Sequence, residues 1–64
     1  MWIVVVQMKN KTVRFLEDAK SGAVGSREAH AHKFPTAEEA GNAGSKLART
    51  SARWVESCFV RRTK

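Results

Sequence analysis

Three side chains in this sequence belong to types that ligate metals or act as nucleophiles: His30, His32 and Cys58. In an extended chain His30 and His32 point the same way, as two ligands of one metal must, and Cys58 is the candidate third ligand. Structural zinc takes four ligands, however, and the sequence has no second cysteine. We therefore expect a solvated histidine pair, with no metal and no cofactor.

The same residues supply the one conceivable catalytic pair, a cysteine activated by a histidine. Cys58 lies in an apolar run, where a packed, unreactive thiol is the ordinary state. Glu38 and Glu39 are adjacent, and a helix start explains both, so they do not form a separated pair for acid–base chemistry. We expect no enzymatic activity.

The whole chain has a net charge of +6, and the positive charge is concentrated in its last third. From residue 46 onward there are six basic groups and one acidic group, Glu56, whereas residues 1–45 carry six and five. Such a field favours a polyanion or an acidic protein surface, although it also keeps a small protein in solution. The candidate binding residues are Arg14, Lys46, Arg49, Arg53, Arg61, Arg62 and Lys64.

Lys46, Arg49 and Arg53 share one helical face if a helix continues through them. If the helix ends earlier, Arg53 still lies beside the other two, and the last residues of the chain add a basic tail. Phosphate contacts need only such cations, whereas base recognition needs groups in a groove or exposed aromatic rings. The sequence has no Tyr, and both Trp are expected in the core, so nucleic-acid binding would depend on phosphates and weaken with salt.

The elements that position these groups fit one domain, residues 1–64, near the lower size limit for a core without disulfides or metal. Residues 2–8 form a β-branched apolar run typical of a buried strand, and residues 12–17 alternate. The KNK segment between them predicts a tight antiparallel hairpin, with Asn10 in the left-handed turn conformation. One face of both strands should form the core, with Trp2, Val4, Val6, Met8, Val13 and Phe15.

A helix is expected after Pro35, because Thr36 and Glu39 have the spacing of a capping box. Residues 18–32, which precede it, are rich in Ala, Gly, Ser and charge, and predict a mobile loop or a poorly formed extra strand. The helix carries a stripe of small residues, despite a cost of about 1 kcal/mol for each mid-helix glycine. This stripe would let it pack close to a sheet, and it comprises Ala37, Ala40, Gly41, Ala43, Gly44, Leu47 and Ala48.

Residues 50–60 are compatible with a strand or with a continued helix. WVESCFV has strand composition, yet its apolar residues also extend the helical stripe. We favour a helix to about residue 50 and a strand over residues 53–61, because Thr50 and Ser51 are poor helix formers. The sequence then predicts an α+β fold, a small antiparallel sheet with one helix packed on it, in the order ββαβ.

The hairpin, a helix start of the form F-x-T-x-E-E-A and a returning apolar strand together resemble the small ββαβ proteins encoded by bacteriophages and mobile elements. The motif comprises Phe34, Thr36, Glu38, Glu39 and Ala40. Several such phage products bind and inhibit host machinery such as RNA polymerase or CRISPR effector complexes. The motif is shared with plant ethylene-response and phage integrase arm-type DNA-binding domains, whose sheets carry arginines and aromatics into the major groove; Arg14 fits that description.

The leading hypothesis is a small non-enzymatic phage-type protein that docks onto a host protein or nucleoprotein assembly and modulates it. The alternative is a nucleic-acid-binding module that contacts phosphates through its basic C-terminal third. A homodimer formed at the edge of the sheet is compatible with either, so we expect a monomer or a weak homodimer. The lone cysteine suits the cytoplasm, and residues 1–8 lack the basic flank, cleavage site and length of a signal or membrane anchor.

Overall fold

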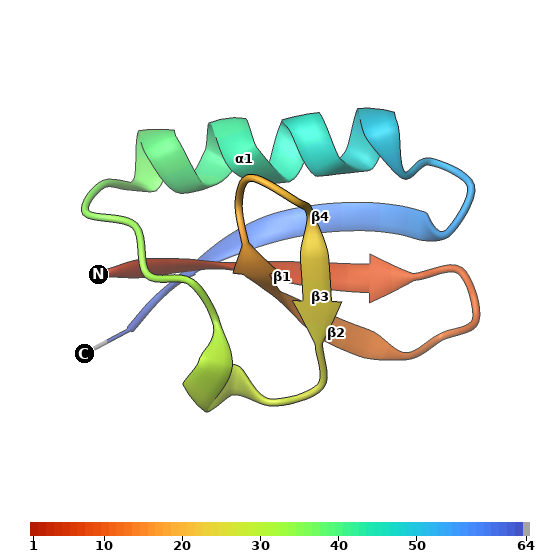
Figure 1. Cartoon of the computed structure of the whole chain (residues 1–64), viewed down its shortest axis with the longest axis horizontal. Helices are drawn as coiled ribbons and strands as arrows, with labels where there is room; N and C mark the ends of the chain where they lie inside the picture. Colours follow the sequence, from red (N-terminus) through yellow and green to blue (C-terminus); the bar gives the residue numbers. More distant parts are fainter. Residues whose placement is uncertain (64) are drawn as a thin grey trace.

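A four-stranded antiparallel sheet with one helix across one face makes up the protein (Figure 1). The computed structural model describes residues 1–63. The strands β1 (Trp2–Met8), β2 (Val13–Asp18), β3 (Ala23–Gly25) and β4 (Val55–Arg62) lie in the spatial order β3-β2-β1-β4. A single 3-10 turn, η1 (Glu28–His30), precedes the helix α1 (Ala37–Thr50). The predicted α+β class is confirmed, and the sheet has one strand more than the ββαβ order includes.

The end of α1 settles the choice between helix and strand for residues 50–60. The Thr36 hydroxyl accepts from the Glu39 N–H at 3.2 Å, as the capping box predicts, and the helix ends at Thr50. After a turn over residues 51–54, β4 returns antiparallel to β1, from Gln7 opposite Ser57 to Trp2 opposite Arg62. The favoured interpretation, a helix followed by a strand, is confirmed.

The added strand β3 lies in the segment expected to be a loop or a poorly formed strand. Its Val24 pairs with Leu16 of β2. The turn before it is closed by the Asp18 carboxylate, which accepts from the Lys20 N–H at 2.9 Å, and by Gly22, whose φ is 76°. The hydrogen bond from the Lys20 backbone lowers the pKa of Asp18, because it favours the charged carboxylate.

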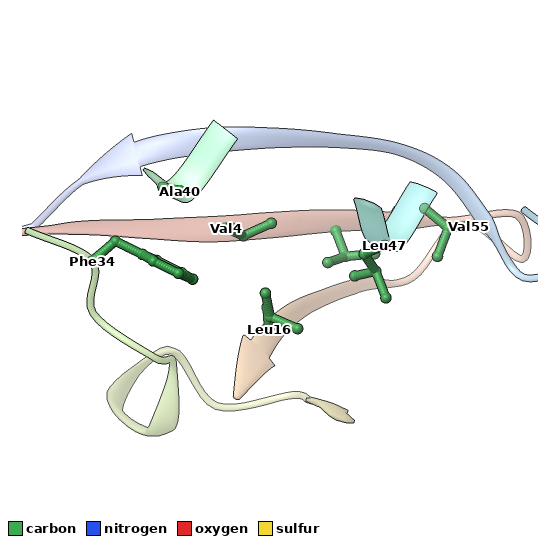
Figure 2. Close-up of a cluster of buried hydrophobic side chains, with 7 residues drawn as sticks. Val4, Leu16, Phe34, Ala40, Leu47 and Val55 are labelled. Atoms are coloured by element: carbon green, nitrogen blue, oxygen red, sulfur yellow. The ribbon is translucent and has the colours of Figure 1, made fainter. Parts of the chain in front are cut away.

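The core lies between the sheet and α1, and it draws side chains from β1, β2, α1, β4 and the segment before the helix (Figure 2). Trp2 and Met8 pack at its margin, so the core face predicted for β1 is confirmed. The buried members are Val4, Val6, Leu16, Phe34, Ala40, Leu47 and Val55.

The core face predicted for β2 is wrong. Val6, on the helix side of β1, pairs with Arg14, and Val5, on the other side, pairs with Phe15. Because side chains alternate along a strand, Leu16 and not Phe15 faces the helix. Val13 is 43% exposed and, like Phe15, lies on the sheet face opposite α1, which we call the open face.

The hairpin loop determines this face, and the expectation of Val13 and Phe15 in the core was inconsistent with the predicted three-residue KNK loop. Met8 lies opposite Thr12, with the Met8 N–H donating to the Thr12 carbonyl at 2.9 Å, so residues 9–11 form the loop between the paired residues. Lys11, with φ 75°, takes the left-handed conformation expected for Asn10. A two-residue turn would shift the pairing by one residue and exchange the faces of β2.

The two central glycines of α1 have different surroundings. A Cβ added at Gly44 would lie 3.3 Å from the Cβ of Cys58 and 3.3 Å from Cγ1 of Val4. A Cβ added at Gly41 would have no heavy atom within 4 Å. Close packing of α1 on the sheet therefore requires glycine at residue 44 and not at residue 41.

This difference predicts opposite effects of alanine at the two positions. Gly41→Ala should raise the free energy of unfolding by about 0.5–1 kcal/mol, because alanine favours the helix and meets nothing. Gly44→Ala should lower it by about 1 kcal/mol, since crowding outweighs the gain in helix propensity. Urea unfolding of both variants at low micromolar concentration measures the difference, and equal changes would contradict this account of the helix packing.

Candidate functional site

The basic residues predicted to bind a partner do not form one surface. Arg53 lies in the turn before β4, whereas Arg61 and Arg62 lie at the other end of that strand, beside the N-terminus. Figure 1 shows these two ends on opposite sides of the molecule. Lys46 and Arg49 are exposed on the second half of α1, toward Arg53, and Lys64 lies outside the described residues.

Arg14 does not lie on the open face, where a sheet that enters a groove would need it. It pairs with Val6 and therefore shares the face that α1 covers, and its guanidinium donates to the Val13 carbonyl at 3.1 Å. The resemblance to groove-binding sheets thus loses the one arginine expected to support it.

Arg61 serves to cover the open face. Its side chain forms an ion pair with Glu28, and its guanidinium lies 5.7 Å from the centre of the Phe15 ring. Ile3, which pairs with Arg61, and Val5 are buried beneath this cover and Ala31. Arg61 is therefore already engaged within the chain.

A different group of cations is brought together at one end of the molecule, which we call the hairpin end: residues 9–11 and 51–54. The Lys9 N–H donates to the Trp54 carbonyl at 2.9 Å and joins the two loops. The loops of residues 9–11 and 51–54 lie side by side at the right of Figure 1, so Lys9 and Lys11 belong to the loop beside that of Arg53 and Trp54. Neither lysine was among the predicted binding residues.

Trp54 is 63% exposed, so the expectation that both tryptophans are buried is wrong. The reason is an irregularity in the pairing of β1 with β4: Met8 pairs with Val55 and Gln7 with Ser57. Val55 thereby fills the core, and Trp54 is left in the turn. The guanidinium of Arg53 lies 5.8 Å from the centre of its ring.

The hairpin end can therefore hold an anion and a flat ring at the same place. Cations bind phosphate oxygens, and an exposed indole stacks on bases of any identity. Arg49, in the last turn of α1, extends the positive charge, and Glu56 at the start of β4 is the acidic residue nearest in sequence to Trp54. Two features of the sequence could have indicated this site: the two lysines of the KNK loop, and the neighbouring residues Arg53 and Trp54.

The residues considered for metal binding or nucleophilic chemistry lie in ordinary environments. No three His, Cys, Asp or Glu side chains within residues 1–63 come together as metal ligands. His32 is exposed and packs edge-on against the Phe34 ring, with 4.6 Å between ring centres. Cys58 belongs to β4, and its half-buried side chain lines the groove beside α1. Burial raises the pKa of its thiol.

Comparison of the chain with protein-family models, with curated proteins and with solved structures finds no match. The part of the chain that the structure describes contains no helix with the length and apolar character needed to cross a membrane.

The environments of the two tryptophans predict unequal effects on stability. Trp54→Ala should change the free energy of unfolding by less than about 0.5 kcal/mol, because the ring packs on the surface. Trp2→Ala should cost about 2–3 kcal/mol, since that ring packs against the core. Urea unfolding followed by circular dichroism compares them, and a large loss for Trp54→Ala would mean that its ring belongs to the core.

The raised pKa of Cys58 predicts that its thiol reacts slowly with alkylating reagents. At pH 8 iodoacetamide should alkylate the folded protein more slowly than the unfolded protein in urea, because fewer thiolates are present and access is restricted. The thiol pKa is higher in the folded state, so unfolding releases a proton and stability should fall as pH rises above the pKa of the unfolded thiol. Faster alkylation of the folded protein would contradict this assignment.

Proposed function

We propose that this protein is a small non-enzymatic module that binds nucleic acid through the hairpin end. Lys9, Lys11 and Arg53 contact phosphates, and Trp54 stacks on a base. The observation that carries the proposal is the exposed Trp54 ring, with Arg53 against it and two lysines in the adjoining loop. A surface indole of this kind contributes little to folding, and its chemistry suits a flat partner.

The proposed ligand is single-stranded rather than duplex nucleic acid. Bases inside a duplex are already stacked and offer no free face to an indole, whereas an unpaired base does. Each stacked base contributes about 1–3 kcal/mol, and each phosphate contact adds salt dependence. The basic helix residues Lys46 and Arg49 extend the field that attracts the strand.

A second candidate is the function suggested by the phage resemblance, docking onto a host protein or nucleoprotein assembly in the cytoplasm. One observation favours it: Phe59 is 52% exposed and Val13 43% exposed on the open face. Exposed apolar side chains on a sheet are a common feature of protein interfaces. The phage resemblance itself stays a prediction.

Fluorescence anisotropy with a labelled single strand of about 12 nucleotides and the matching duplex tests the proposed function. The single strand should bind more tightly, and its affinity should fall as salt rises from about 50 mM to about 200 mM. Trp54→Ala should weaken single-strand binding about tenfold, a loss of about 1.4 kcal/mol. Lys9→Ala should reduce the slope of log affinity against log salt by about 0.7.

Lys33→Ala is the matched control, because it removes one exposed lysine from the segment between η1 and α1. Figure 1 shows that this segment enters α1 at the end of the molecule opposite the hairpin end. It should leave the salt slope and the preference for single strands almost unchanged. Equal losses for Lys9→Ala and Lys33→Ala would show that net charge alone drives binding. Failure to bind either ligand at low salt would reject the proposal and favour a protein partner.

A further inference from the structure

A cavity lies between α1 and the turn that joins β2 to β3 (Figure 1). Its volume is about 230 Å³. A cavity of about 150 Å³ in another protein holds benzene, so this one has room for a single ring with a small group attached. The cavity is separate from the hairpin end, because residues 9–11 and 51–54 do not line it.

Short side chains leave this space open above an apolar floor. Gly22, whose φ is 76°, brings the turn against α1: a Cβ added there would lie 3.5 Å from Cδ1 of Leu47. Ala19 and Ala43 line the cavity beside this contact and do not fill it. Leu16 and Leu47, which are 1% and 5% exposed, form the floor. The inner part of the cavity therefore suits a hydrocarbon or aromatic body.

Two cations line the same cavity. Lys20 belongs to the turn and Lys46 to α1, and both are exposed. Within residues 1–63 neither forms an ion pair, and no acidic residue lines the cavity. Asp18 attracts Lys20 weakly, but its carboxylate accepts from the Lys20 backbone N–H at 2.9 Å and belongs to the turn. Two like charges on one cavity repel each other, and an anion between them would remove that repulsion.

We propose that this cavity binds a small phosphate monoester whose apolar or aromatic body lies on the leucine floor. Lys20 and Lys46 contact the phosphate oxygens from the two sides of the cavity. A phosphate monoester carries about −1.5 to −2 charges at pH 7, which matches two lysines, whereas a carboxylate carries one.

The same match of charge distinguishes this ligand from the strand proposed at the hairpin end. Each phosphodiester inside a nucleic-acid strand carries one negative charge, so two lysines on one cavity suit a monoester better. The apolar floor adds a second requirement, because inorganic phosphate has nothing to place on it. The site is therefore a further binding activity, and it does not rest on the proposed function.

An amide-shift NMR titration with phenyl phosphate, at about 50 mM salt and without nucleic acid, tests the proposal. Phenyl phosphate should bind saturably with a Kd of about 1 mM or lower, and the largest shifts should occur at Gly22, Lys46 and Leu47. Inorganic phosphate lacks the ring and benzoate has a single charge, so each should bind at least about tenfold more weakly.

Two half-buried alanines of α1 supply a matched pair of variants. Ala43→Leu fills the cavity and should abolish binding of phenyl phosphate. Ala48→Leu places the same side chain in the groove beside β4 and should retain binding. Lys20→Ala and Lys46→Ala should each weaken binding about tenfold, whereas Lys33→Ala should not. Circular dichroism checks that each variant is folded.

Absence of binding at about 10 mM phenyl phosphate would overturn the proposal. Equal affinities for phenyl phosphate and inorganic phosphate would also overturn it, because the ring would then lie outside the cavity. Equal losses for Lys33→Ala and Lys46→Ala would reduce the binding to net charge, and benzoate binding as tightly as phenyl phosphate would reject the match to a dianion. Since no nucleic acid is present, these outcomes are independent of the proposed function.

Discussion

Burial of β1 on both faces is the constraint on which this small structure depends. Ile3, Val4, Val5 and Val6 are all at most 2% exposed, so each face of the strand needs its own cover. The helix α1 covers one face and approaches closely because Gly44 has no side chain. The other face is covered by Ala31, which the chain after β3 supplies, and by Arg61 lying against Phe15.

This double cover determines which residues remain available for a partner. The segment that follows β3 returns across the open face, and Glu28 in η1 holds Arg61 there. Arg14, on the helix side of β2, donates a hydrogen bond to the carbonyl of the preceding residue, Val13. What is left for binding lies where elements end, as at the hairpin end. In a chain of 64 residues, the core takes most of the sheet surface and binding shifts to the margins.

Local signals in the sequence were sufficient for β1, β2, α1 and β4, but they left β3 undecided and did not determine the face of β2. The apolar run predicts β1 within its observed bounds, and the Thr36 cap and the weak helix formers after Arg49 predict both ends of α1. The face of β2 follows from pairing Met8 with Thr12 across the three-residue KNK loop, whereas alternation along residues 12–17 fits either face and was used without that constraint. The exposure of Trp54 depended on a one-residue irregularity opposite Met8, which carries no sequence signature. Both errors concern register, where one residue reverses every side chain that follows.

Register also determines which charges lie near the hairpin end. The irregularity that turns Trp54 outward also includes Glu56, the acidic residue closest in sequence to the proposed phosphate contacts. The net charge of +6 is screened over about 8 Å at physiological ionic strength, so the attraction between this protein and a polyanion weakens as salt rises, whereas stacking on the Trp54 ring does not depend on charge. The share of the affinity that comes from the ring should therefore increase with ionic strength.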